Sequence, residues 1–323
     1  MDDSGVDIKD AQNTFLEILN KLNGKSVPAF LNWVTSSFSM ENEEQKPKYI
    51  RDANAHIAAI AEHLRQKVPT KGYLQSEKIA YPKVGLDAEC NDSNTIHVDC
   101  FLFDEEAVED LVQEGKISRN YCLDCGSKNT KPLTFISHSL APTQLEFIFT
   151  KLVPLIKKPQ DFKVIDIGSR LGSVIFSAHY FSAGSSCVTG VELNEDLCKI
   201  QKEVVEEFNL TNVNVICSDI RNQPEVIKDA DLIIMNNVFN FFMELGDQLS
   251  CWQFLHDNVK PGCLLIHHPS VYEAASHLTL PFDISEWLEE ISITRKCAEF
   301  AGGDEELFMD CKQLHFYKVR SRN

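Results

Sequence analysis

Residues 164–173 read VIDIGSRLGS, an apolar run that passes into a turn with two glycines. The run predicts a buried strand, and the segment after the turn has the composition of a helix. Gly168 lets the backbone approach a ligand closely, and the amides that open the next helix can face a negative group. The stretch therefore predicts a ligand-binding turn between a strand and a helix.

The next three strand-like runs also end in polar side chains. The second run leads to Glu192, whose carboxylate can accept hydrogen bonds from both hydroxyls of a ribose. The third leads to Asp219, where a carboxylate can accept a bond from the exocyclic amino group of adenine, and the fourth ends in Asn236 and Asn237. Open α/β sheets bind ligands at the carboxyl ends of their strands. The four features together predict a pocket at one edge of a sheet.

Short β-branched runs alternate with helix-length segments from about residue 162 onward. This pattern is typical of a parallel sheet with helices on both faces. The last two runs are separated by an acidic stretch with two adjacent glycines, so we expect them to form a closing antiparallel hairpin. The seven runs occupy residues 163–167, 187–191, 213–217, 230–235, 262–267, 291–297 and 312–319.

The first part of the chain has a different pattern. To about residue 67 its apolar residues follow helical spacing, and a second amphipathic helix is expected over 143–155. Residues 69–95 are polar and turn-rich and predict a long loop or a weakly ordered insert, and residues 96–103 alternate like a strand. Asp104 is expected to cap a short acidic helix. We expect residues 1–136 to form a mainly helical region that acts in substrate recognition or as a lid, and 137–323 to form the second domain.

The strand-end features resemble those of the class I S-adenosylmethionine-dependent methyltransferases, over roughly residues 137–319. Asp166, Gly168 and Gly172 match the spacing of the first motif of that family, Glu192 its ribose-binding acid and Asp219 its adenine-side acid. The resemblance implies an α/β fold with a Rossmann-like, seven-stranded, mostly parallel sheet. It also implies that Asn236 faces the methyl group as the catalytic residue. The implied cofactor-binding residues are Asp166, Gly168, Ser169, Arg170, Gly172, Glu192, Leu193, Asp219, Ile220, Asn236 and Asn237.

Arg170 departs from the pattern of that family, which usually has glycine at this position. A long cation beside the methionine part of the cofactor either crowds it or pairs with its carboxylate. The same residue argues against a nicotinamide-dependent oxidoreductase, because the sequence G-x-G-x-x-G needs a second glycine there.

A narrower resemblance concerns the substrate. Residues 166–169, 190–192 and 235–239 are similar to motifs of the seven-strand histone lysine methyltransferases of the disruptor-of-silencing type, although Val238 interrupts their Asn-Asn-Phe run. The Ser-His-Ser entry at 137–139 is similar to that family and also to the isoaspartyl methyltransferases. This similarity implies a protein substrate.

Cys122 and Cys125 form a C-x-x-C-G turn that can present two thiolates to zinc. Structural zinc needs two further ligands, and no nearby pair has clean spacing. We therefore favour two ordinary thiols over a zinc site. The nearby candidates for the missing ligands are Cys90, His97, Cys100 and His138.

The net charge of −17 argues against a protein that coats DNA or RNA, because such a chain repels phosphate. An acidic surface can attract a basic partner. The acidic run at 104–114 could receive a basic protein tail, although helical spacing favours a solvated face.

Most of the 11 cysteines lie in apolar runs, which is typical of reduced thiols in a cytoplasmic or nuclear protein. The start of the sequence is acidic and has no apolar h-region, so we expect no secretory signal, and the apolar runs fall short of the about 20 residues of a membrane helix.

The leading hypothesis is a transferase that moves a methyl group from S-adenosyl-L-methionine to an unknown acceptor, with a basic protein substrate slightly favoured. Asn236 would orient the acceptor, for instance a lysine amine or a ring nitrogen. The alternative is a catalytically inactive binding or scaffold protein in which Arg170 spoils the pocket.

His267 and His268 could offer a general base, but a structural role is favoured. The aromatic residues at 239, 241 and 242 either wall a substrate channel or belong to the core.

Overall fold

A computed structural model describes residues 8–28, 30, 31, 34, 46–70, 73–85, 87–123, 130–155, 162–182 and 187–321. The helices are α1 (Ile8–Lys21), α3 (Lys48–Arg65), α4 (Glu105–Gln113), α5 (Pro142–Phe147), the π-helical η2 (Ile148–Leu152), the 3₁₀ turn η3 (Val153–Leu155), α6 (Ser173–Phe181), α7 (Glu195–Glu207), the 3₁₀ turn η4 (Ile220–Asn222), α8 (Pro224–Asp229), α9 (Leu245–Asn258), α10 (Val271–Ala274), α11 (Ile284–Trp287), α12 (Thr294–Ala301) and α13 (Glu305–Lys312). The strands are β1 (Thr95–His97), β2 (Asn120–Cys122), β3 (Thr130–Pro132), β4 (Thr134–Ile136), β5 (Lys163–Ile167), β6 (Cys187–Glu192), β7 (Val213–Cys217), β8 (Leu232–Asn236), β9 (Leu264–His268), β10 (Leu288–Glu290) and β11 (His315–Val319).

The central sheet has seven strands in the order β10-β11-β9-β8-β5-β6-β7. All neighbouring pairs are parallel except those of β11, which runs antiparallel to both β9 and β10. The chain moves outward from β5 to β6 and β7, then returns to the other side of β5 at β8. This change of direction leaves a crevice beyond the carboxyl ends of the strands, where ligands bind in open α/β sheets. The expected α/β fold is confirmed.

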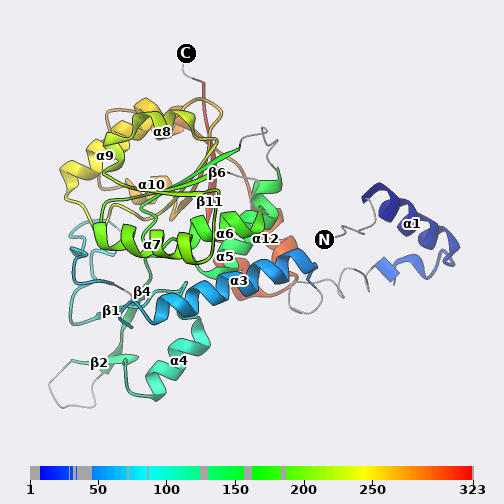
Figure 1. Cartoon of the computed structure of the whole chain (residues 1–323), viewed down its shortest axis with the longest axis horizontal. Helices are drawn as coiled ribbons and strands as arrows, with labels where there is room; N and C mark the ends of the chain where they lie inside the picture. Colours follow the sequence, from blue (N-terminus) through cyan, green and yellow to red (C-terminus); the bar gives the residue numbers. More distant parts are fainter. Residues whose placement is uncertain are drawn as a thin grey trace.

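Alternation along the strands divides the core into two layers. In β5, Val164 packs into the layer that contains α6, whereas Ile165 and Ile167 pack into the layer that contains Trp252 of α9. Figure 1 shows α6 and α7 on one side of the sheet and α8 and α9 on the other. Because side chains alternate along a strand, Asp166 lies on the same side as Val164.

The N-terminal region shares the core of the sheet. In α3, Ile57, Ile60 and Leu64 are buried in the same layer as α6, alongside which the helix runs in Figure 1. Two small sheets follow, the parallel pair β1–β4 and the antiparallel pair β2–β3. The division of the chain between residues 136 and 137 stays a prediction.

Two expected strands differ in the structure. The strand expected at 96–103 ends at His97, because the Asp99 carboxylate accepts hydrogen bonds from the amides of Phe101 and Leu102 and bends the chain. The run at 291–297 does not form the sixth strand. Its place is taken by β10, and α12 begins at Thr294.

The spacing of the buried side chains explains this second difference. Cys297, Phe300 and Ala301 are buried at helical spacing. The closing antiparallel pair is nevertheless present, as β10 and β11.

Several N-terminal expectations agree with the structure. The segment expected to be helical over 143–155 is formed by α5, η2 and η3 in succession, and Asp104 caps α4 by accepting a bond from the amide of Ala107. Within the described ranges, no helix is long and apolar enough to cross a bilayer.

Candidate functional site

A cavity of about 340 Å³ lies beyond the carboxyl ends of β5, β6, β7 and β8. Its wall combines strand ends with the loop around Ser76, with His138, and with the segment after β8. Seven of the residues expected to bind a cofactor line it: Gly168, Arg170, Glu192, Leu193, Asp219, Ile220 and Asn236.

The other four expected residues, Asp166, Ser169, Gly172 and Asn237, are not among the residues that line the cavity. Asp166 is buried on the α6 side, and burial together with the nearby Glu192 carboxylate raises its pKa well above the usual range. Ser169 donates a hydrogen bond to Gln201. Gly172 has φ +86° where α6 begins, and Asn237 donates its backbone N–H to His268. The role of these four residues in binding a cofactor stays a prediction.

Gly168 is required by the geometry of the turn. Its φ of +74° lies in the left-handed region, and a Cβ atom there would lie 2.0 Å from Cγ2 of Val238. The amide of Gly168 also donates to the carbonyl of Val191, which ties the turn to β6. The bare backbone therefore fits between β6 and the segment that follows β8.

Glu192 connects the turn to the loop after β6. Its Oε2 accepts the backbone N–H of Arg170 at 2.9 Å, and its Oε1 accepts that of Asn194 at 2.8 Å. Burial raises the pKa of this carboxyl, and the two amide bonds offset part of that effect. The side chain thus lines the cavity and also fixes two backbone segments beside it.

Asp219 begins η4 at the end of β7. Arg221 reaches back to it with Nη2 at 2.6 Å from Oδ2, and this hydrogen bond lowers the pKa of Asp219. The same guanidinium contacts Asp247 of α9 at 2.7 Å. Asp219 is therefore held ionised at the β7 end of the cavity.

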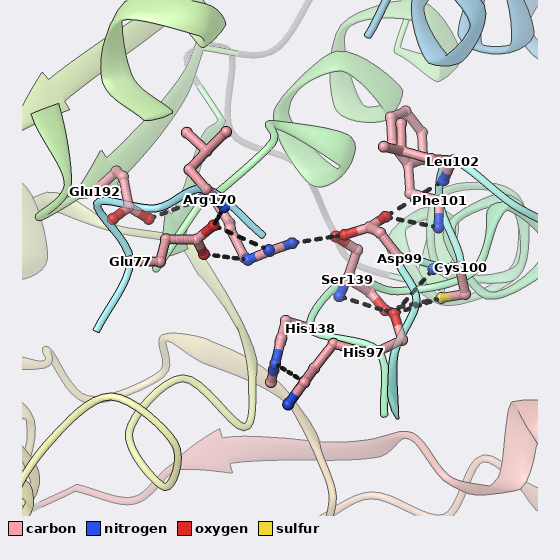
Figure 2. A network of polar contacts seen from close by, with 12 residues as sticks. Glu77, His97, Asp99, Cys100, Phe101, Leu102, His138, Ser139, Arg170 and Glu192 are labelled. Atoms are coloured by element: carbon pink, nitrogen blue, oxygen red, sulfur yellow. Dashed lines mark hydrogen bonds and ion pairs between the residues drawn. The ribbon is translucent and has the colours of Figure 1, made fainter. Parts of the chain in front are cut away.

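Arg170 extends away from the turn into a buried network with two carboxylates of the N-terminal region (Figure 2). Its Nη1 lies 2.6 Å from Oδ2 of Asp99, and its Nε lies 2.9 Å from Oε1 of Glu77. All three side chains are at most 7% exposed. The guanidinium is thus bound by protein carboxylates, an arrangement different from the two expected from sequence.

The β8 end of the cavity is lined by Asn236, His138 and aromatic rings. Oδ1 of Asn236 lies 2.8 Å from Nδ1 of His268. Phe239 and Phe242 line the cavity, which agrees with a channel wall, whereas Phe241 is buried against the ring of His138 at 5.2 Å. His138 was missed as a pocket residue, because it is separated by a loop and a helix from the strand ends that carry the other polar groups.

The remaining candidates lie elsewhere. Cys122 is exposed, and Cys125 lies outside the described residues. Among the residues that the structure places, no group of three or more His, Cys, Asp or Glu side chains is arranged to hold a metal ion. His267 is buried, and its Nδ1 donates to the carbonyl of Pro269 at 2.6 Å.

Comparison with solved structures gives remote matches. They include a candidate S-adenosyl-L-methionine-dependent methyltransferase from Methanococcus maripaludis (19% identity, 39% of this chain, 55% of that one, TM-score 0.33). They also include an RNA methyltransferase from Salinibacter ruber in complex with S-adenosyl-L-homocysteine (13% identity, 55% of this chain, 92% of that one, TM-score 0.35). A third is an S-adenosylmethionine-dependent O-methyltransferase from Thermotoga maritima (18% identity, 49% of this chain, 56% of that one, TM-score 0.34). The chain thus spans about half the length of the first of these.

No curated protein matches the sequence. A family model described as a methyltransferase domain matches residues 158–320, which is half of the chain and contains the whole seven-stranded sheet. The chain therefore belongs to the methyltransferase domain family.

Proposed function

We propose that this protein is an active methyltransferase that binds S-adenosyl-L-methionine in the cavity at the carboxyl ends of β5 to β8. One observation carries the proposal: the cavity joins the glycine turn, a buried carboxylate after β6, a second carboxylate after β7 and an amide after β8. Its volume lies within the range of cavities that bind small molecules, about 300–1,000 Å³.

The order of the strands gives the direction of the cofactor. Neighbouring strands lie about 4.8 Å apart, so the tips of β7 and β8 are separated by roughly 14 Å, the reach of an extended nucleoside joined to an amino acid. Asp219 and Ile220 would contact the adenine, and Glu192 the ribose hydroxyls. The amino-acid part would then cross Gly168, and the methyl group would face Asn236.

The donor set fits this ligand. Glu192 presents carboxylate oxygens, which accept bonds from two adjacent hydroxyls, and Leu193 offers an exposed apolar side chain to the purine. Arg170 is engaged by Glu77 and Asp99, so we assign the cofactor carboxylate to Lys78, a cation in the cavity lining.

The chemistry divides between the cofactor and the chain. The cofactor supplies an activated methyl group when bound. The residues of this chain hold the acceptor in line with that group, and Asn236, fixed by His268, orients it. The aromatic rings of Phe239 and Phe242 would keep water from this end of the cavity.

The acceptor we favour is a basic segment of a protein in the cytoplasm or nucleus. Support comes from the net charge of −17, which attracts a basic partner and repels nucleic acid, and from the resemblance to lysine methyltransferases.

The alternative, an inactive scaffold, rested on obstruction of the pocket by Arg170. The guanidinium is held by two carboxylates while the cavity retains about 340 Å³, and this favours the enzyme.

Two experiments separate these functions. In a thermal shift assay, S-adenosyl-L-methionine and S-adenosyl-L-homocysteine should raise the melting temperature and NAD should not, because a ligand of the folded state stabilises it. Incubation with methyl-labelled cofactor and an extract of cells that lack the protein should then label a protein band. Binding without any labelled acceptor would favour the scaffold, and stabilisation by NAD alone would overturn the assignment.

A further inference from the structure

A line of three polar side chains starts at the cavity wall and leads into the N-terminal region. Nε2 of His138 lies 3.0 Å from Nδ1 of His97, and Nε2 of His97 lies 3.3 Å from the hydroxyl of Tyr81. His138 lines the cavity, and Figure 2 shows its ring facing that of His97. One ring nitrogen of His138 is thus taken by His97, which leaves Nδ1 for a ligand.

The position of this imidazole matches the acceptor end of the cavity. The ring of Phe242 lies 5.0 Å from that of His138, centroid to centroid, and Phe242 belongs to the segment that follows Asn236 at the tip of β8. The residues assigned to ribose and adenine follow β6 and β7, on the other side of β5. His138 therefore lies near the proposed position of the methyl group.

The surroundings keep His138 neutral. Burial lowers its pKa well below the usual range, and the Arg170 guanidinium and His97 lower it further. Burial and Arg170 also lower the pKa of His97, against a smaller opposing effect of Asp92. Tyr81 and Tyr73 also face the pair, with rings that lie 5.8 and 5.5 Å from that of His97. The low pKa leaves the imidazole unprotonated at physiological pH, with a lone pair that can take a proton and pass it on but cannot hold it, whereas the amide of Asn236 cannot take one.

We propose, building on the proposed function, that His138 is a catalytic residue that takes the proton from a nitrogen acceptor during methyl transfer. The lone pair of the acceptor nitrogen forms the bond to the methyl carbon as the carbon–sulfur bond breaks and its electron pair stays on sulfur. The nitrogen–hydrogen bond breaks with its electron pair left on nitrogen, and the proton passes to Nδ1 of His138.

His97 and Tyr81 act as positioning residues in this scheme. Nε2–H of His138 donates to Nδ1 of His97, and Nε2–H of His97 donates to the hydroxyl of Tyr81. This set of tautomers leaves Nδ1 of His138 unprotonated, on a side chain that lines the cavity. The assignment implies an acceptor nitrogen that carries a proton, such as a lysine amine or an imidazole of a protein.

The tautomer can be tested without any acceptor. In long-range 1H–15N spectra of protein labelled with 15N-histidine, His138→Asn and His97→Asn assign the two rings by difference. At pH 7.5, with S-adenosyl-L-homocysteine bound, Nδ1 of His138 should have the chemical shift of an unprotonated nitrogen and Nε2 that of a protonated one. A protonated Nδ1 would overturn the proposal even if the protein proves to be a methyltransferase.

Activity provides the second test, with labelled S-adenosyl-L-methionine and the proteins of the cell extract. His138→Ala should lower the rate about 100-fold or more, the typical contribution of general-base catalysis, and added imidazole should restore part of it. The affinity for S-adenosyl-L-homocysteine should change less than twofold, and His256→Ala, outside the cavity lining, should retain the rate. An unaltered rate in His138→Ala would contradict the proposal. So would a loss of cofactor affinity that imidazole does not rescue, which would make His138 a cofactor contact.

Discussion

Arg170 places its Nη1 atom 2.6 Å from Oδ2 of Asp99, a residue that precedes it by 71 positions in the chain. Arg170 belongs to the glycine turn, and Asp99 belongs to the N-terminal region. Both side chains are buried, and Glu77 completes the network (Figure 2). These ion pairs therefore connect the turn proposed to hold the cofactor to the N-terminal region, which lies outside the seven-stranded sheet.

Replacing Arg170 should destabilise the protein strongly. Arg170→Met leaves the buried carboxylates of Asp99 and Glu77 without their cation, and breaking such a network costs about 3–5 kcal/mol. Arg170→Gly should also destabilise, although glycine relieves the strain of its φ of +45°. Urea unfolding followed by circular dichroism measures both.

Arg295→Met is the matched control, because Arg295 is 90% exposed in its pair with Glu299 and should contribute less than about 1 kcal/mol. Equal losses in Arg170→Met and Arg295→Met would mean that the buried network does not stabilise the fold.

Gly168→Ala should disrupt the turn between β5 and α6. The new Cβ would collide with Val238 at 2.0 Å, and the φ of +74° would be strained. We expect a loss of at least about 2 kcal/mol. Gly246→Ala in α9 meets no atom within 4 Å and should stabilise by about 0.5–1 kcal/mol. Thermal unfolding of both variants checks this, and similar behaviour of the two would contradict the described packing.

His267 should make the protein sensitive to acid. Burial lowers its pKa to about 4, below the unfolded value of about 6.5, so between these pH values the unfolded chain binds a proton that the native state excludes. The stability that this neutral imidazole contributes is fully present above pH 6.5. It falls as the pH drops, and the free energy of unfolding is lower by about 3 kcal/mol at pH 4. His267→Gln removes this titration. The stability difference between parent and variant should therefore narrow from pH 7.5 to pH 4.5 in urea unfolding, and a constant difference would argue against a buried neutral imidazole.

Lys78→Met should weaken binding of S-adenosyl-L-homocysteine about three- to tenfold, because it removes the cation assigned to the carboxylate of the cofactor. A charge-assisted bond from an exposed side chain has this order of magnitude. Lys83→Met, in the same loop but outside the cavity lining, should bind as the parent does. If both variants keep the parental affinity in calorimetry, the carboxylate lies elsewhere.

The sequence predicted the sheet well because strand runs and strand-end polar residues are local signals. Glu192 and Asp219 could be placed in one pocket because parallel strands end at the same edge of a sheet. Glu77 could not be found in this way, since an acid in a polar loop gives no sign of which distant cation it will meet. Asp99 was hidden within an apparent strand, and its own turn-forming carboxylate ended that strand. The place of His138 in the cavity wall could not be predicted either, because only tertiary packing brings this residue to the end of β8.

The most direct test of the proposed site is calorimetric titration of S-adenosyl-L-homocysteine into the parent, Glu192→Gln and Glu192→Ala. Glu192 accepts two backbone amides, so Ala also loosens the wall, and Gln keeps the size of the side chain without its charge. Each lost bond to a charged group is worth about 1.5–3 kcal/mol. The account predicts one site per chain in the parent and at least tenfold weaker binding in both variants, measured well below their melting temperatures. No binding to the parent, or the parental affinity in Glu192→Ala, would contradict the assignment of this cavity to the cofactor.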